Sequence, residues 1–383
     1  MSPEPVRVGY LPLLDAAPLI IAQELGFAAE ERLSLDLILA VSWSALRDML
    51  TFGRVDAASL LSPIPIASIL HLGGIAARID ALMVTSLGGE GIVVSHGLAE
   101  TMRANGYGFD FADAAGAARA LHQAHPRPLR IASPFPFSMH GELLYRWLGE
   151  GIEVQTVPPP LMHQEMAAGR IDLFCVGEPW ASRTVELGIG DYLLPGTAIW
   201  QAPPDKILAM RHEDVEADSP IIGPLMRATW RACRWLAQPQ NVLAASEILS
   251  RPAWLDVPAE MLERLLSGRV NVASSGAERQ ARIIELHAGC ATFPWRSQAE
   301  WIGAALARRH GLDVAAARLT ARAVFRSDLY RRFLAEAGAD LPSASSRLEG
   351  GVDQPGLHPA ASGKVHLLPD QFFDGLIFDP DKP

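Results

Sequence analysis

Apolar and polar positions in the first half of the chain form two kinds of segment. Short apolar runs, such as 6–10 and 57–61, have the length and composition of buried strands. Longer segments with helical spacing of their apolar residues separate these runs. Strands that alternate with helices in this way predict an α/β fold with parallel sheets, because each helix carries the chain back across the sheet.

The same order of elements occurs twice. Each copy has a strand, a helix, a second strand and a short helix, and each ends in a similar four-residue stretch before a buried strand. The two stretches are Gly53-Arg54-Val55-Asp56 and Gly169-Arg170-Ile171-Asp172. Glycine at these points ends a helix, and the following apolar run has the pattern of a parallel strand covered on both faces. The repeat predicts two doubly wound α/β lobes, with chance similarity of two generic α/β segments as the alternative.

Two facing lobes of this kind form a cleft, because doubly wound sheets bind ligands beyond the carboxyl ends of their strands. We expect lobe I to begin with residues 1–87 and lobe II to comprise 88–203. The chain then returns to lobe I over 204–337, a largely helical segment. Residues 338–383 are rich in Pro, Gly, Ser and Asp, which predicts an extended tail wrapped on the surface.

Charge and cysteine content exclude several classes of function. The 383 residues include 33 basic and 43 acidic ones, for a net charge of -10, and no basic block, which argues against nucleic acid or an anionic membrane as the main partner. The three cysteines are far apart and indicate neither a disulfide framework nor a metal-ligand pair. A signal peptide has a basic region, then an apolar region, then a cleavage site with small residues. The segment that begins at Met1 shows none of these, so we expect a cytoplasmic protein.

Motifs of catalysis are not found. The sequence has no Walker loop, no Gly-x-Ser-x-Gly elbow and no Cys-x-x-Cys pair, and its histidines lack the spacing of metal sites. We therefore expect a binding protein without cofactor or metal rather than an enzyme.

Several residues at the predicted strand ends favour a small anion site. Ser42 is a predicted N-cap that places Trp43 in the first helical turn, and Lys206 lies where the chain returns between the lobes. The loop before His140 opens a helix, whose amides attract anions. Glu178 follows a buried strand and is expected to face the cleft. A core aromatic, a solvated lysine and a capping histidine are the structural alternatives.

These segments resemble the nitrate- and bicarbonate-binding proteins of ABC transporters, which have the type II periplasmic-binding-protein fold. The resemblance covers about residues 6–340, and its most specific marks are 9–18, Ser42-Trp43, 177–180 and 204–206. It implies that Trp43 and Lys206 contact an oxyanion.

The resemblance implies further contacts from lobe II. The loop from Pro136 to His140 would supply a backbone donor and a histidine. A side-chain amide of the family falls near His96 here, with Glu90 as the neighbouring candidate. The ligand set implied by the strand ends and the resemblance together is Trp43, His96, Pro136, His140, Glu178 and Lys206. Because the sequence shows no acidic cluster of the kind that binds calcium in bicarbonate binders, nitrate or nitrite is favoured over bicarbonate.

Within this family the expected location selects the cytoplasmic nitrate/nitrite sensors of the NasS type. Such a protein holds an RNA-binding antitermination regulator, NasT-like with an ANTAR domain, and releases it when the anion binds. The alternative is the substrate-binding component of an ABC transporter for nitrate or a related oxyanion. A third reading, an enzyme such as the pyrimidine synthases of thiamin biosynthesis, would require a cysteine-rich loop that the sequence does not show.

Overall fold

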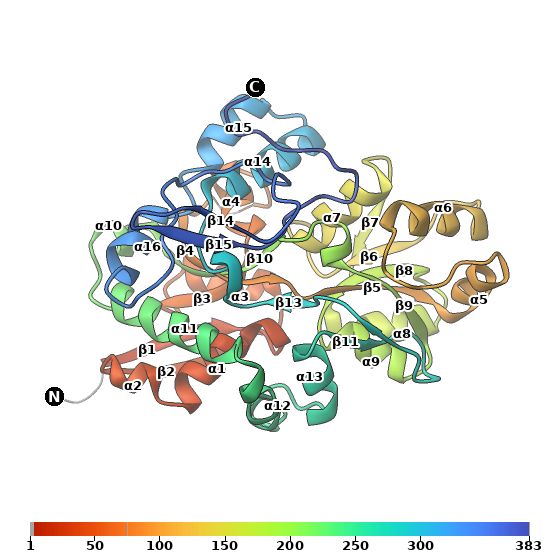
Figure 1. Ribbon diagram of the computed structural model, residues 1–383, viewed down its shortest axis with the longest axis horizontal. Helices are drawn as coiled ribbons and strands as arrows, with labels where there is room; N and C mark the ends of the chain where they lie inside the picture. The colour runs from red at the N-terminus through yellow and green to blue at the C-terminus, as the bar shows by residue number, and fades with distance from the viewer. Residues whose placement is uncertain (1–3, 75, 383) are drawn as a thin grey trace.

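The computed structural model describes residues 4–74 and 76–382 and has two α/β lobes side by side (Figure 1). The sheet of lobe I has the strand order β13-β4-β10-β3-β1-β2, and the sheet of lobe II has the order β7-β6-β8-β5-β9. The strands of lobe I are β1 (Glu4–Tyr10), β2 (Leu33–Leu39), β3 (Ala57–Leu61), β4 (Ile79–Gly88), β10 (Pro204–Arg211) and β13 (Ile284–Glu285). Those of lobe II are β5 (Glu90–Ser95), β6 (Ile131–Ser133), β7 (Val154–Thr156), β8 (Leu173–Gly177) and β9 (Gly190–Pro195).

The two sheets are built alike. In lobe I, β1 pairs in parallel with β2 and β3, and in lobe II β6 pairs in parallel with β7 and β8. In each sheet the next strand is antiparallel: β10 beside β3, and β5 beside β8. These two strands are the ones that follow the crossings between lobes, so each lobe receives its reversed strand directly from the other.

Helices cover both faces of the sheets. In the first pass through lobe I they are α1 (Ala17–Glu24), α2 (Phe27–Glu30), α3 (Trp43–Thr51) and α4 (Pro63–Ile69), with the 3-10 turn η1 (Leu14–Ala16) before α1. Lobe II contains α5 (His96–Ala104), α6 (Ala114–Ala124), α7 (Met139–Leu148), α8 (Met162–Ala167), α9 (Trp180–Glu186) and the turns η2 (Pro159–Leu161) and η3 (Gly196–Ala198). The later helices are α10 (His212–Glu216), α11 (Ile222–Leu236), α12 (Val242–Leu249), α13 (Ala259–Leu266), α14 (Arg296–His310), α15 (Val314–Ala321) and α16 (Ser327–Leu334), with η4 (Pro239–Asn241) and η5 (Ala288–Cys290).

The predicted repeat has a matching local structure. Arg7 donates from its backbone N–H to Asp56 Oδ2 at 2.9 Å, and its guanidinium contacts the same carboxylate and the Gly53 carbonyl. In lobe II, Arg130 makes the corresponding contacts: its backbone N–H donates to Asp172 Oδ2 at 2.9 Å, and its guanidinium reaches the same carboxylate and a glycine carbonyl. The first pair ties β1 to the start of β3, and the second ties the start of β6 to the start of β8.

The segment expected to return to lobe I makes an excursion. Residues 259–280, with α13 and the two-stranded sheet of β11 (Arg269–Asn271) and β12 (Glu278–Gln280), contact lobe II. The Tyr192 N–H on β9 donates to the Val272 carbonyl at 2.8 Å, and Arg264 forms an ion pair with Glu186. Part of the segment predicted to return to lobe I at 204–337 thus contacts lobe II, because amphipathic periodicity does not tell which lobe a helix covers.

The C-terminal segment is also more than a surface tail. It forms a hairpin, β14 (Gly356–Pro359) and β15 (Lys364–Leu367), and then passes over the junction of the lobes, as the dark blue chain in Figure 1 shows. The buried ring of Phe372 stacks on Trp200 and Trp301 with centroid separations of 4.7 and 5.7 Å, and Asp374 pairs with Arg146 of α7 at 2.8 Å. Phe372 of this segment is therefore part of the buried core, together with Trp200 and Trp301.

No helix in the described ranges 4–74 and 76–382 has the length and apolar character needed to cross a membrane.

Candidate functional site between the two lobes

The carboxyl edges of both sheets meet at the junction of the lobes. The Leu14 N–H of lobe I donates to the Glu178 carbonyl of lobe II at 2.9 Å. A Cβ atom on Gly177, at the end of β8, would lie 3.6 Å from Leu13 and 3.6 Å from His140 Nε2. Glycine at this position therefore lets the two lobes and the histidine approach one another closely.

Trp43 comes from lobe I, at the start of α3. Ser42 caps this helix as predicted, with its Oγ accepting from the Ala45 N–H at 3.1 Å. The Trp43 side chain is only 2% exposed, and its Nε1–H has no hydrogen-bond acceptor in the described part of the chain. A buried indole donor without an acceptor is rare, and it fits a site that a polar ligand completes.

Lys206 lies near the start of β10, opposite Leu61 of β3 and Ser86 of β4. Its side chain is fully buried, which excludes the solvated surface lysine considered from sequence. The ammonium lies 2.9 Å from Asp15 Oδ2, contacts the Asp205 carboxylate, and is 5.1 Å from the centre of the Trp43 ring. Burial alone would lower the pKa of Lys206, but the charges of Asp15 and Asp205 outweigh it and raise the pKa.

His140 enters from lobe II in the first turn of α7. Its ring is fully buried, and neither ring nitrogen has a hydrogen-bond partner among the described residues. The Nδ1 atom lies 4.0 Å from Asp205 Oδ1 across the junction. Burial, helped by the charge of Lys206, lowers the pKa of His140 well below its ordinary value, so the imidazole is neutral. A neutral imidazole has one N–H donor to offer an anion.

His96 and Glu90 are the two candidates for the position at which the resembled family has a side-chain amide. The structure brings Glu90, and not His96, to the junction. Because β5 runs antiparallel to β8, its first residue Glu90 lies opposite Gly177, at the carboxyl edge. His96 follows the other end of β5, with a half-exposed side chain and its Nδ1 2.9 Å from Asp191 Oδ1. The structure therefore places His96 away from the junction, since sequence spacing along one strand does not show its direction in the sheet.

Pro136 and Glu178 lie close to the junction but contribute differently from the prediction. Pro136 is exposed and has no N–H; the helix that follows it is capped by Ser138, whose Oγ accepts from the Gly141 N–H at 3.2 Å. The Glu178 side chain turns away from the other lobe and accepts from the Ser182 N–H and Oγ–H, both at 3.1 Å. Its backbone, rather than its carboxylate, spans the junction.

Three buried carboxyl groups surround the one ammonium, and the sequence analysis did not predict this acidic cluster. They belong to Asp15, Asp205 and Glu90, which are 3%, 0% and 0% exposed. Burial raises the pKa of Asp205 to about 6 against the opposing charge of Lys206, and burial together with the Asp205 charge raises that of Glu90 well above its ordinary value. Asp15 and Asp205 are far apart in the sequence, and their neighbours are apolar or cationic, so no acidic motif marks them. Only the fold shows that their side chains lie close together.

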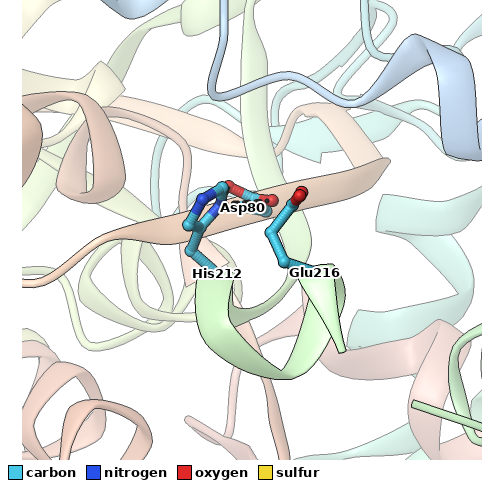
Figure 2. Close-up of side chains that lie close together, drawn as sticks. All are labelled: Asp80, His212 and Glu216. Carbon is cyan, nitrogen blue, oxygen red and sulfur yellow. Dashed lines mark hydrogen bonds and ion pairs between the residues drawn. The ribbon is translucent and has the colours of Figure 1, made fainter. Parts of the chain in front are cut away.

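A second cluster of possible metal ligands lies away from the junction. Asp80 of β4 and His212 and Glu216 of α10 point toward one another (Figure 2), with their ligand atoms within 4.8 Å. The Arg326 guanidinium already lies among them: its Nη1 is 2.7 Å from Asp80 Oδ2 and 3.0 Å from Glu216 Oε1. The group is therefore a mixed ion-pair network that joins the helices to β4, not a cation site.

Comparison with known proteins agrees with this architecture. Residues 1–250 match the model of the NMT1-like family. The chain belongs to the NMT1-like family. The crystal structure of the periplasmic nitrate-binding protein NrtA from Synechocystis PCC 6803 superposes with a TM-score of 0.82, at 26% identity, over 99% of this chain and 96% of that one. The ligand-binding component of an ABC-type import system from Staphylococcus aureus shares the fold, with a TM-score of 0.62. The predicted fold class, a periplasmic-binding-protein fold of two lobes, is confirmed.

Curated relatives of this NMT1-like protein are named as binding and transport proteins. The nitrate/nitrite binding protein NrtA of Nostoc is 28% identical over 98% of this chain and 83% of its own length. The bicarbonate-binding protein CmpA of Synechococcus elongatus is 27% identical over 99% and 84%. The nitrate import ATP-binding protein NrtC of Synechocystis is 27% identical over 98% of this chain but 53% of its own length. These relatives are solute-binding or transport components, which agrees with the predicted binding protein and gives no support to the enzyme reading.

Proposed function

We propose that this NMT1-like protein binds nitrate, nitrite or a similar small planar oxyanion between its two lobes. The observation that carries the proposal is the convergence of Lys206, Trp43 and His140, all buried, at the junction of the carboxyl edges of both sheets. An ammonium, an imidazole and the first turn of α7 offer positive charge and N–H donors to an anion. The flat indole ring favours a flat ligand over a tetrahedral one.

Isothermal titration calorimetry of the purified chain tests this proposal. Sodium nitrate, sodium nitrite, sodium bicarbonate and sodium sulfate are titrated separately, and a planar anion is expected to bind while sulfate does not. His140→Gln should weaken binding at least about tenfold, since a charge-assisted hydrogen bond is lost or misplaced. His122→Gln, a change of an exposed histidine, is the matched control. Failure of all three planar anions to bind the folded chain would refute the function.

We further propose that the binding serves transport as the substrate-binding component of an ABC importer. The support is the agreement over nearly the whole chain with relatives named as nitrate and bicarbonate binders and with part of an ATP-binding import protein. The site draws its residues from both lobes, which is the arrangement that closure of two lobes around a solute requires.

A cytoplasmic sensor that holds a NasT-like antiterminator remains the second proposal, and it rests on the sequence resemblance alone. Both roles use the same site and differ in partner and location. Gel filtration of the chain mixed with an ANTAR-type RNA-binding protein, with and without nitrate, separates them. A complex that dissociates on addition of nitrate supports the sensor, and the lack of any complex supports the importer.

A further inference from the structure

Glu90 has a buried carboxyl group that faces the Asp205 carboxyl group and has only its own backbone N–H as a nearby donor. Its side chain is fully buried at the start of β5, and no ammonium, guanidinium, hydroxyl or amide group of another described residue donates to its carboxyl oxygens. The Oδ1 atom of the neighbouring Asp205 accepts from no such group either. An ionised Glu90 would lose its hydration without a cation bound to it, which costs several kcal/mol, whereas Asp205 is paired with Lys206.

Gly196 of η3 packs against the Glu90 side chain and brings no titratable group. The titratable groups near Glu90 lie on four other elements. They are Asp205 and Lys206 of β10, Asp15 of η1, Cys175 of β8 and Tyr192 of β9. The one cation among them, Lys206, already contacts both aspartates. The positive charge therefore favours ionised Asp15 and Asp205, whereas Glu90 makes no ion pair in the described chain. Of the three carboxyl groups, Glu90 is the one best placed to keep its proton.

The chemistry of the ligand makes this proton necessary. Nitrate has three acceptor oxygens and no donor, so a carboxylate in contact with it would repel it, whereas a carboxylic acid can donate an O–H. We propose that Glu90 is a specificity-determining residue that binds as a neutral carboxylic acid and donates a hydrogen bond to the anion, so that binding is coupled to one proton. This inference rests on the proposed function, and it concerns the protonation of that site.

The proton can serve both states of the protein. Without a ligand, the Glu90 O–H can donate to the unpartnered oxygen of Asp205, and burial together with the Asp205 charge raises the pKa of Glu90 well above its ordinary value. With the anion present, the same O–H turns to an anion oxygen. Whenever Glu90 is ionised before binding, the proton is taken from solvent, and no covalent bond between heavy atoms forms or breaks.

The test measures nitrate binding and proton uptake together. Calorimetric titrations of the full chain with sodium nitrate are made between pH 6 and 9, in pairs of buffers with different ionisation enthalpies and with EDTA to exclude divalent cations. The difference in heat between the buffers gives the protons taken up per nitrate, without any mutation. The variants are Glu90→Gln, which keeps a neutral donor of the same shape at all pH values, and the exposed control Glu153→Gln.

We expect wild type and Glu153→Gln to lose at least about tenfold in nitrate affinity toward pH 9, with uptake approaching one proton per nitrate. Glu90→Gln should change less than about twofold over this range and take up no proton. Equal pH dependence in wild type and Glu90→Gln, or nitrate binding by wild type without proton uptake at any pH, would overturn the inference and leave the proposed function intact. Absence of nitrate binding by folded wild type at every pH would overturn both.

Discussion

The Lys206 ammonium of β10 lies 2.9 Å from the carboxylate of Asp15 in η1, and both side chains are buried. This pair joins the returning strand to the turn that follows β1. Together with Asp205 it forms a compact group of charges at the place where an anion is expected. The lysine therefore has a structural role as well as a proposed binding role, and the two must be measured separately.

Lys206→Ala should destabilise the protein by about 3–5 kcal/mol, since it leaves the buried Asp15 and Asp205 carboxyl groups without their cation. Urea unfolding followed by circular dichroism measures this loss. Lys364→Ala, on the exposed side of β15, should change stability by less than about 0.5 kcal/mol. If Lys206→Ala unfolds at the wild-type urea concentration, the ion pairs contribute no net stability.

Much of the fold could be predicted from the sequence because its signals are local. The apolar run at 57–61 is β3, the helix predicted to open at the loop before His140 is α7, and Ser42 is the N-cap of α3. The two Gly-Arg-x-Asp stretches indicated the repeat, and the Arg–Asp contacts in both lobes explain why that pattern recurs.

The rest depends on contacts between distant segments. The direction of β5 in its sheet decides that Glu90 and not His96 reaches the junction, and no local pattern contains that direction. The burial of Lys206 follows from pairing with two other strands. Phe372 lies in a short apolar stretch of the tail, and only the fold shows that its ring stacks on Trp200.

Glu178 should make the stability of the protein depend on pH. Burial raises its pKa from 4.5 to about 7 in the folded state, against the opposing hydrogen bonds from Ser182. The folded state holds the Glu178 proton more tightly than the unfolded state. The contribution of this group to the free energy of unfolding is therefore greatest below pH 4.5 and is lost as the pH rises through about 7. The shift corresponds to about 3 kcal/mol at alkaline pH.

Glu178→Gln, which stays neutral, should therefore gain stability relative to wild type as the pH rises from 5 to 8.5. Unfolding by urea at several pH values measures the difference between the two proteins, which cancels the effects of other groups such as Glu142. A difference that stays constant over this range would show that the Glu178 carboxyl group has an ordinary pKa.

The twin contacts at Asp56 and Asp172 should contribute to stability but not to anion binding. Each carboxylate accepts hydrogen bonds from a backbone N–H and a guanidinium at the start of β3 or β8, at the edge of the sheet opposite the junction. Asp56→Ala and Asp172→Ala should each cost about 1–3 kcal/mol in unfolding free energy. Nitrate affinity measured by calorimetry should stay within about twofold of wild type. A large loss of affinity would show that these residues influence how the two lobes come together around the anion.

Arg309 of α14 should hold the lobes together, because it pairs with the buried Glu142 of α7, the helix that also carries His140. Arg309→Gln should weaken nitrate binding about 5- to 30-fold, since an open form becomes more populated while the binding groups remain unchanged. The neighbouring exposed Arg308→Gln is the control. Small-angle X-ray scattering should show a larger radius of gyration for Arg309→Gln at low nitrate, returning to the wild-type value at saturation. Wild-type affinity and compactness in this variant would mean that the ion pair has no part in closure.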